Sequence, residues 1–298
     1  MSLAAVELVE VGPRDGLQDE PRFLPTAQKA ELVRRVIAAG VRRVEATGFA
    51  RPDRVPALAD AEALLATLGD LPPHVRLSAL VLNEHGLDRA LRCGVREVTM
   101  VVLATDTFSL RNQGMPMAEA AAAARRIVGT AARHGIATGV TVAAAFGCPY
   151  EGPVARENVV DLACRLAESG PSEIVLADTI GAGRPDEVAE LVAAVASSAG
   201  LPVRGHFHNT HGRAIDNALA AVDAGVTAID CSLSGLGGCP SAPEGANRGN
   251  IASERFAAVL AERGIPGPDP TELSAAALWL RGRLLAAVPL HTVVPGHV

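Results

Sequence analysis

Short apolar runs alternate with longer stretches of helical periodicity along the whole chain. The short runs are rich in Val, Ile and Leu and predict strands at 6–11, 42–47, 75–82, 97–104, 137–144, 173–178, 202–208 and 226–233. Between them, apolar residues recur at helical spacing and predict helices at 26–39, 56–68, 86–93, 117–134, 154–169, 185–199 and 211–224, with another at 251–263. Several of these helices end at a glycine, the residue favoured just past a helix C-terminus.

This alternation of strands and helices predicts an α/β fold, the (β/α)8 or TIM barrel. A doubly wound sheet is the alternative, and it would carry a glycine-rich phosphate turn after the first strand. The segment found there, VGPRDG, does not match G-x-G-x-x-G. No break in composition marks a second domain. We therefore expect a single domain, with the barrel over about 5–263 and an extension over about 264–298 that adds one C-terminal helix.

Composition narrows the class of protein. Of the 298 residues, 49% are hydrophobic and 20% are charged, which suits a large buried core. A net charge of -6 and only 3% aromatic residues argue against nucleic-acid binding. The five scattered cysteines suit a reducing cytoplasm better than a disulfide framework. We expect no membrane span, because no long uncharged apolar segment occurs, and no signal peptide, because the first residues lack a basic start.

Unusual polar residues fall at the carboxyl ends of the predicted strands, where TIM barrels place their active sites. His206 and His208 are two positions apart on one predicted strand and therefore point to the same face. Either both are structural core residues or they share a metal ion. Asp15 offers a carboxylate oxygen and Asn250 an amide oxygen. Such a mixed set of nitrogen and oxygen ligands suits Mg²⁺ or Mn²⁺, with Zn²⁺ or Co²⁺ as alternatives.

Two other side chains suggest chemistry at the same end. Arg14 stands beside Asp15, where a guanidinium either holds a substrate carbonyl or carboxylate or forms a surface ion pair. Cys239 lies in the glycine-rich stretch SGLGGCPSAPEGANRGN, where exposure near a cation would lower the pKa of the thiol. Cys148, which precedes Pro149, is a weaker second candidate for a reactive thiol.

Six segments, in order, resemble the 3-hydroxy-3-methylglutaryl-CoA lyase family. They are VEVGPRDGLQDE, VEATGF, AAAFGCPYEGP, ADTIGAG, HFHNT and SGLGGCP, and they cover the chain from about residue 6 to 263. The segment RDGLQ alone would indicate only a wider superfamily of metal-dependent barrels that make or break carbon–carbon bonds next to an acyl-CoA. The GLGGCP loop indicates the lyase branch.

This resemblance implies a function and a set of site residues. The family cleaves 3-hydroxy-3-methylglutaryl-CoA to acetyl-CoA and acetoacetate by a metal-assisted retro-Claisen reaction. By position, Asp15, His206, His208 and Asn250 match its divalent-cation ligands, and Arg14 matches the residue that orients the thioester carbonyl. The other matching positions are Cys239 and His206 for proton transfer, Glu45 as an acid–base group, Glu254 near the site, and Asp178, Gly237 and Gly238 for substrate contact. The resemblance also implies that the chain binds an acyl-CoA substrate and forms a homodimer with a second copy of itself.

The glycine-rich loop departs from the family pattern. It is two residues longer between Cys239 and the final Asn than the common G-C-P-x-A-x-G-A-x-G-N. Asn250 is the better match for the metal ligand, and Asn247 is the other possibility. Asn209 stands where many members have Asp. These differences lie near the acyl pocket, so a longer 3-hydroxy-3-acylglutaryl-CoA is an alternative substrate.

Three other functions compete with the lyase. A synthase of the same superfamily, which condenses an acyl-CoA with a 2-oxoacid, shares RDGLQ and HFHN. Such relatives usually carry an extra C-terminal domain, for which the segment after the last barrel helix is short. A pyruvate-type aldolase is the second alternative. The third is a barrel without activity that binds an acyl-CoA or a metal.

Overall fold

The computed structural model describes residues 6–238 and 249–290 and contains a closed barrel of eight parallel strands in sequence order. The barrel closes where β1 pairs with β8, with Glu7 opposite Ala228 and Glu10 opposite Cys231. The predicted TIM barrel is therefore confirmed. All predicted strands are present, and the structure places them at β1 (Glu7–Glu10), β2 (Arg43–Gly48), β3 (Arg76–Leu80), β4 (Glu97–Leu103), β5 (Ala137–Ala143), β6 (Glu173–Asp178), β7 (Val203–Phe207) and β8 (Ala228–Cys231).

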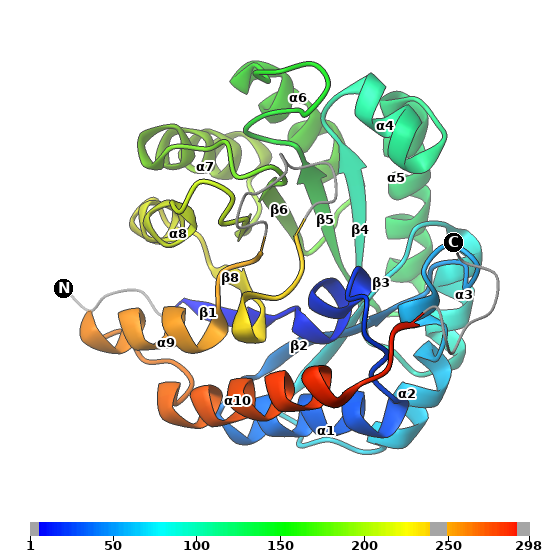
Figure 1. Cartoon of the computed structure of the whole chain (residues 1–298). Helices are drawn as coiled ribbons and strands as arrows, with labels where there is room; N and C mark the ends of the chain where they lie inside the picture. Colours follow the sequence, from blue (N-terminus) through cyan, green and yellow to red (C-terminus); the bar gives the residue numbers. More distant parts are fainter. Residues whose placement is uncertain (1–5, 239–248, 291–298) are drawn as a thin grey trace.

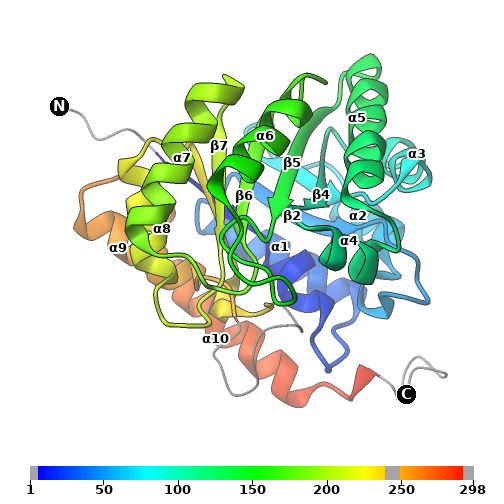
Figure 2. The same cartoon turned by 90° about the horizontal axis from the view of Figure 1, so that it is seen from above.

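Helices surround the barrel on its outside, as Figures 1 and 2 show. They are α1 (Thr26–Ala38), α2 (Ala61–Leu68), α3 (Glu84–Arg92), α4 (Asp106–Gln113), α5 (Met117–Arg133), α6 (Arg156–Ala167), α7 (Pro185–Ala199), α8 (Ala214–Asp223), α9 (Ser253–Glu262) and α10 (Pro270–Ala286). The added C-terminal helix is α10, which packs against α1 and α9 (Figure 1). Among the described helices, none combines the length and the apolar character needed to cross a membrane.

The structure corrects the sequence prediction at several helices. Helix α4 was not predicted, because its sequence DTFSLRNQ shows no apolar face. The predicted helix 56–68 is two elements, a short 3-10 turn at Pro56–Leu58 followed by α2. Helix α3 begins at Glu84, two residues early, because the Asn83 side chain accepts a hydrogen bond from the Gly86 N–H at 2.8 Å and caps it. The remaining ends differ by only a few residues.

The end of β1 is joined to the last barrel elements by one buried carboxyl group, that of Glu10. It accepts hydrogen bonds from the backbone N–H groups of Gly12 and Leu233, at 2.8 and 2.9 Å. It also contacts the Ser253 hydroxyl at 2.5 Å. These contacts hold the turn after β1 against the start of the loop after β8 and against α9, which are the segments that carry much of the site.

We expect Glu10 to make the stability of the fold depend on pH. Burial raises its pKa from 4.5 to about 7, despite the three hydrogen bonds. The folded state therefore favours the protonated carboxyl, and its contribution is fully present below about pH 4.5 and lost as the pH rises through 7. Glu10→Gln should remove up to about 3 kcal/mol of this decline. Urea unfolding of both proteins between pH 4.5 and 8 measures it, and identical slopes would contradict the assignment.

Candidate active site

Arg14 and Asp15 enter the mouth of the barrel from one tight turn after β1. This π-helical turn spans Gly12–Gly16, and the N–H groups of Arg14, Asp15 and Gly16 all donate to the Val11 carbonyl at 2.7 to 3.2 Å. Pro13 at the start of the turn has no N–H to satisfy, which suits that position. The sequence prediction placed both residues at a strand end but did not foresee the π-helical turn. Because of this turn, the consecutive side chains of Arg14 and Asp15 both line the cavity of the site.

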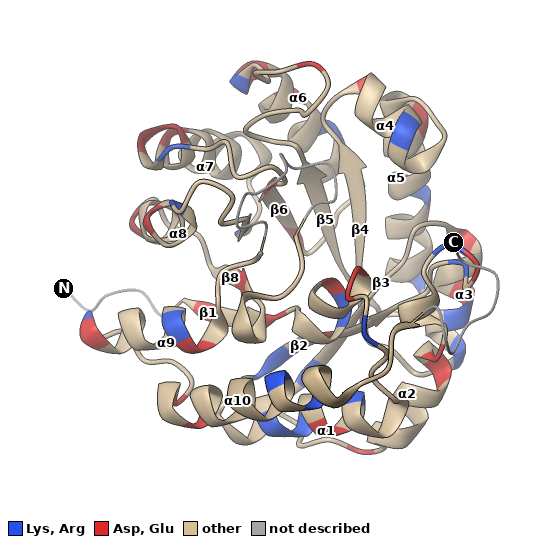
Figure 3. Ribbon diagram, in the orientation of Figure 1, with Lys and Arg blue, Asp and Glu red and all other residues tan. Residues whose placement is uncertain are grey.

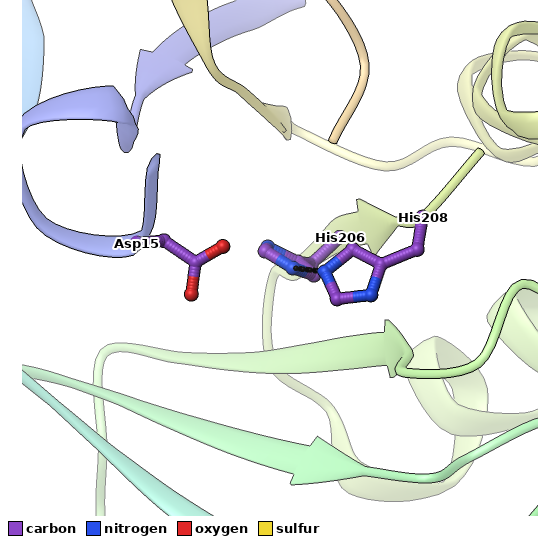
Figure 4. Close-up of side chains that lie close together, drawn as sticks. All are labelled: Asp15, His206 and His208. Carbon is purple, nitrogen blue, oxygen red and sulfur yellow. Dashed lines mark hydrogen bonds between the residues drawn. The ribbon is translucent and has the colours of Figure 1, made fainter. Parts of the chain in front are cut away.

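His206 and His208 lie at the end of β7 and face Asp15. Their Nε2 atoms are 2.9 Å apart, and the ring centroids are 4.9 Å apart with the rings edge to face. The three residues each place one donor atom within 4.8 Å of the others. Figure 4 shows the Asp15 carboxylate facing the two imidazoles from the opposite side of the mouth.

The second nitrogen of each imidazole is held by an acceptor. His208 Nδ1 lies 2.7 Å from the Thr179 carbonyl oxygen, which accepts but cannot donate, so Nδ1 carries the hydrogen. His206 Nδ1 lies 3.0 Å from an oxygen of Asp230. With both Nδ1 atoms donating, the two Nε2 lone pairs face each other. Such an arrangement is stable only with a positive charge, a proton or a metal cation, between them.

The charges around the pair agree with this reading. Burial alone would lower the pKa of His206, but the hydrogen bond to Asp230 and the charges of Asp15 and Asp230 raise it. Burial and the neighbouring His206 lower the pKa of His208 to about 4. Burial favours the protonated form of Asp15, but Arg14 and the two histidines outweigh it and hold its pKa well below the usual range. The Asp15 carboxylate is therefore firmly ionised and supplies one negative charge to the cluster.

Asn250 completes the cluster from the segment before α9. It pairs with His208 in an antiparallel bridge. Its Nδ2 donates to Asp15 Oδ2 at 2.7 Å and to the Leu236 carbonyl at 2.8 Å, both of which are acceptors, so the orientation of the amide is fixed. Among the described residues, nothing donates to its buried Oδ1 atom. A buried oxygen without a donor is costly in a folded protein unless a cation or water contacts it.

These four side chains fit a divalent cation. The two Nε2 atoms are 2.9 Å apart, close enough for both to contact one ion. The Asp15 carboxylate and the unsatisfied Asn250 Oδ1 add oxygen donors, which Mg²⁺ and Mn²⁺ prefer.

Arg14 and Glu45 form a rigid pair beside this cluster. Arg14 Nε donates to Glu45 at 2.5 Å, and Nη1 donates to Asp15 at 2.6 Å. The other oxygen of Glu45 accepts a hydrogen bond from the Thr99 hydroxyl. Two of the three guanidinium nitrogens are thus fixed, which aims the group at the cavity. In this geometry Glu45 orients Arg14, and its predicted role in acid–base chemistry stays a prediction.

The cluster lies in a cavity of about 750 Å³ at the mouth of the barrel. Arg14, Asp15 and both histidines line it, together with Thr99 and Gly238. Arg51 and Arg54 line the same cavity from the loop after β2, and Arg111 lines it from α4. A cavity of this volume suits a small-molecule substrate, and cationic side chains suit a substrate that carries anionic groups.

The other predicted site residues lie in different settings. Asp178 is fully buried and accepts hydrogen bonds from the N–H groups of Ala182 and Gly183, so it shapes the loop that contains Thr179. Burial raises its pKa to about 6, although these two hydrogen bonds lower it. Cys148 is buried and contacts the Thr105 hydroxyl at 3.1 Å. Cys239 and Asn247 lie outside the described residues.

Gly237 packs directly against the cluster. Its φ of +92° is in the left-handed region, and an added Cβ would lie 2.7 Å from Asn250 Nδ2 and 2.8 Å from the Asp15 carbonyl oxygen. We expect Gly237→Ala to destabilise the fold by about 1–3 kcal/mol and to weaken Mn²⁺ binding by about tenfold, because Asp15 and Asn250 must move apart. Calorimetric titration and thermal unfolding measure the two effects.

Gly264 offers the matched control for this substitution. Its φ is +69°, and no atom of the described residues lies within 4 Å of an added Cβ. Gly264→Ala should therefore cost about 1 kcal/mol of stability and leave Mn²⁺ affinity unchanged. If both variants bound Mn²⁺ as the wild type does, Gly237 would have no part in shaping the cluster.

The sequence prediction missed Asp230 and the Thr179 carbonyl, which orient the two imidazoles. The signal for Asp230 was present in the segment AIDCS, where an acidic residue interrupts an apolar strand. The parallel register pairs Asp230 with His206, so both side chains point into the barrel. The Thr179 carbonyl has no sequence signal, because any residue would supply it.

Comparisons with known proteins show the family of the chain. The model of the HMGL-like family matches residues 5–278. The (R)-citramalyl-CoA lyase of Chloroflexus aurantiacus is 37% identical, over 96% of this chain and 93% of its own length. The hydroxymethylglutaryl-CoA lyase of Pseudomonas mevalonii is 42% identical, over 85% of this chain and 83% of its own length.

A solved structure is similar over nearly the whole chain. It is an HMG-CoA lyase from Acinetobacter baumannii in complex with coenzyme A and 3-methylmalate. The sequence identity is 32% and the TM-score is 0.88, with 99% of this chain and 96% of that chain covered.

Proposed function

Because the chain belongs to the HMGL-like family of lyases, we propose that it cleaves 3-hydroxy-3-methylglutaryl-CoA to acetyl-CoA and acetoacetate with a divalent cation. The observation that carries this proposal is the cluster of Asp15, His206, His208 and Asn250 directly beside the fixed guanidinium of Arg14. Mg²⁺ and Mn²⁺ are the cations that the donor set favours.

The reaction imposes three demands on the site. The tertiary hydroxyl must lose its proton, the bond between its carbon and the methylene next to the thioester must break, and the resulting enolate must gain a proton at carbon. When bound, a divalent cation would lower the pKa of the hydroxyl and hold a neighbouring carboxylate. The electron pair of the broken bond moves onto the thioester, where negative charge develops on the carbonyl oxygen.

Arg14 is the group that would meet this charge. Its orientation is set by Glu45 and Asp15 before any substrate binds, so little reorganisation is needed during the reaction. The proton transfer to the enolate that was predicted for His206 stays a prediction, because its Nδ1 contacts Asp230 and its Nε2 faces the proposed cation. Cys239 is the other candidate, proposed on the family resemblance alone.

The experiment that tests this proposal follows the products. The purified chain is incubated with Mg²⁺ and 3-hydroxy-3-methylglutaryl-CoA, and acetyl-CoA and acetoacetate are quantified. We expect both in equal amounts. If neither formed, and acetyl-CoA together with a 2-oxoacid were consumed instead, the synthase or aldolase alternative would replace the lyase. If no acyl-CoA substrate, including the second candidate below, reacted at all, a barrel that only binds its ligand would explain the protein better.

Citramalyl-CoA is the second candidate substrate, and the likeness to an (R)-citramalyl-CoA lyase favours it. Its tertiary alcohol carries the carboxylate directly, so the same bond cleavage releases acetyl-CoA and pyruvate. The two substrates share the thioester and the hydroxyl but differ in the length of the acid arm. Turnover of each at equal concentration, with acetoacetate and pyruvate measured separately, decides between them.

Two further proposals concern the protein as a whole. We propose that it acts as a homodimer, on the family resemblance, and in the cytoplasm, because its scattered cysteines suit a reducing compartment. Analytical ultracentrifugation of the purified chain measures the mass in solution, and a monomer at micromolar concentration would contradict the first of these.

A further inference from the structure

The interior of the barrel beneath the candidate metal cluster is ionic. Five charged side chains point into it from five strands, and each is at most 5% exposed: Arg43, Glu97, Glu173, Arg204 and Asp230. Figure 3 shows charged positions on the strands of the barrel as well as on the outer helices. The interior of a TIM barrel is usually filled by branched apolar residues, so this arrangement needs its own explanation.

These five side chains form a continuous series of contacts, which we name the interior ion chain. Arg43 Nε donates to Glu97 at 2.7 Å, and Arg43 Nη1 and Nη2 both donate to Glu173, at 3.1 and 2.5 Å. Glu173 lies 3.3 Å from Arg204 Nε, and Arg204 Nη1 lies 3.3 Å from Asp230. The series thus runs from β4 through β2, β6 and β7 to β8.

The last member of the interior ion chain contacts the candidate metal cluster. Asp230 presents one oxygen to Arg204 and the other to His206 Nδ1, at 3.0 Å. Arg204 attracts this carboxylate through its charge and without a hydrogen bond, so the position of Asp230, and with it that of the His206 ring, depends on Arg204. His208 has no such connection, because its Nδ1 contacts a backbone carbonyl.

A contribution to the stability of the fold does not explain well why the barrel interior contains the interior ion chain. Removing several charges from water is expensive, and well-packed apolar residues often replace buried ion pairs without loss of stability. Two guanidinium groups face three carboxylates in this interior, so the charges do not cancel within the chain of contacts. What the arrangement supplies is a fixed position for each carboxylate, including the one that orients His206.

We propose that Arg204, supported by Glu173 and Arg43, is a positioning residue that fixes Asp230 and through it the His206 ring for cation binding. This inference rests on the proposed function of the cluster as a cation site. Arg204 also lines the cavity, but in this role it contacts no cation. It acts through the carboxylate of Asp230.

The direction in which cation affinity changes when Arg204 is removed distinguishes a positioning role from a simple effect of its charge. A guanidinium near the cluster repels a divalent cation, so its removal would tighten cation binding if charge alone mattered. Loss of a group that positions a ligand weakens cation binding, by about 10–100-fold when the group contacts the ligand itself, as Asp230 does, and by less when it acts through such a group, as Arg204 does. The two explanations therefore predict opposite changes in the same variant.

The test uses Arg204→Met and Arg204→Lys in the full chain, with Mn²⁺ affinity measured by titration calorimetry or electron paramagnetic resonance. We expect Arg204→Met to weaken Mn²⁺ binding by up to about tenfold, and Arg204→Lys by less, because lysine keeps a positive charge near Asp230. The ring-nitrogen NMR spectrum of the metal-free protein should also lose the strongly hydrogen-bonded Nδ1–H of His206 in Arg204→Met. Unchanged or tighter Mn²⁺ binding by Arg204→Met would overturn the proposal.

Lys29→Met is the matched control for a buried cation outside the interior ion chain. Lys29 is 3% exposed and pairs with Asp60 at 2.6 Å, in the region of α1 and α2. This variant should lose stability without losing Mn²⁺ affinity, and an equal loss of affinity would show a global defect and overturn the specific role of Arg204. Wild-type chain that bound no Mn²⁺ would reject the cation site itself. Wild-type binding with unchanged affinity in Arg204→Met would reject only the positioning role.

Discussion

Replacing Arg14 by methionine is expected to lower the kcat of thioester cleavage by about a thousandfold, the usual cost of losing one preorganised donor to a developing oxyanion. Arg14 is aimed at the cavity by Glu45 and Asp15, at 2.5 and 2.6 Å, so its loss removes charge stabilisation that nothing else in the pair supplies. Mn²⁺ affinity should stay the same or rise, because Asp15 no longer shares its charge with a guanidinium. Steady-state kinetics and Mn²⁺ titration of the same preparation measure both.

Arg14→Lys provides the graded control for this prediction. It keeps the charge but has one nitrogen where the guanidinium uses separate nitrogens for Glu45 and Asp15. We expect a kcat between those of the wild type and Arg14→Met. If Arg14→Met kept the wild-type kcat, or lost kcat only in proportion to a loss of Mn²⁺ affinity, Arg14 would not stabilise the transition state.

The second large effect is expected from Asp15→Asn, which keeps the size of the side chain and removes its charge. The carboxylate is firmly ionised, and it is the only anion among the four proposed ligands. Cation affinity should fall by about a hundredfold or more, because affinity at such sites depends strongly on the number of charged ligands. Activity at low Mg²⁺ should fall with it and recover in part at high Mg²⁺.

Asp19→Asn is the control for Asp15→Asn. Asp19 also lines the cavity, four residues along the chain, but it is not part of the candidate metal cluster. Burial and the nearby Asp15 raise its pKa, so it contributes less negative charge near the cavity. We expect at most a small change in Mn²⁺ affinity. Equal losses in the two variants would mean that general negative charge, and not ligation by Asp15, attracts the cation.

The periodicity of the sequence was enough to predict the barrel. Its strands carry runs of Val, Ile and Leu that need burial on both faces, and glycines mark where the helices end. Glycines such as Gly94 and Gly135 indeed adopt positive φ after α3 and α5. Helix α4 escaped prediction because it shows no apolar face, and its position follows from the tertiary structure.

Part of the candidate site was also predictable from the sequence. The two-residue spacing of His206 and His208 on a strand predicted a shared face, and the structure places their Nε2 atoms 2.9 Å apart. That Asp15 and Asn250 join them follows from barrel closure, which brings the ends of the chain together. Sequence periodicity carries no information on such long-range distances, so these two residues were predicted from their places near strand ends and from the family resemblance.

The remaining features depend on geometry that the sequence does not encode locally. The role of Asp230 follows from the register between β7 and β8, and the interior ion chain from side chains on five different strands. Glu45 illustrates the same point, because its contact with Arg14 at 2.5 Å joins residues on different elements. A charged residue within an apolar strand is the sequence signal that could have directed attention to these positions.

The most direct test of the central claim is the dependence of acetyl-CoA formation on bound Mn²⁺. Metal-free protein is titrated with Mn²⁺, and free Mn²⁺ and the rate of acetyl-CoA release from 3-hydroxy-3-methylglutaryl-CoA or citramalyl-CoA are measured in the same samples. We expect no acetyl-CoA release without the cation. The rate of release should rise in proportion to bound Mn²⁺, up to one ion per chain. Release that was independent of Mn²⁺, or no release from either thioester at full Mn²⁺ occupancy, would contradict it.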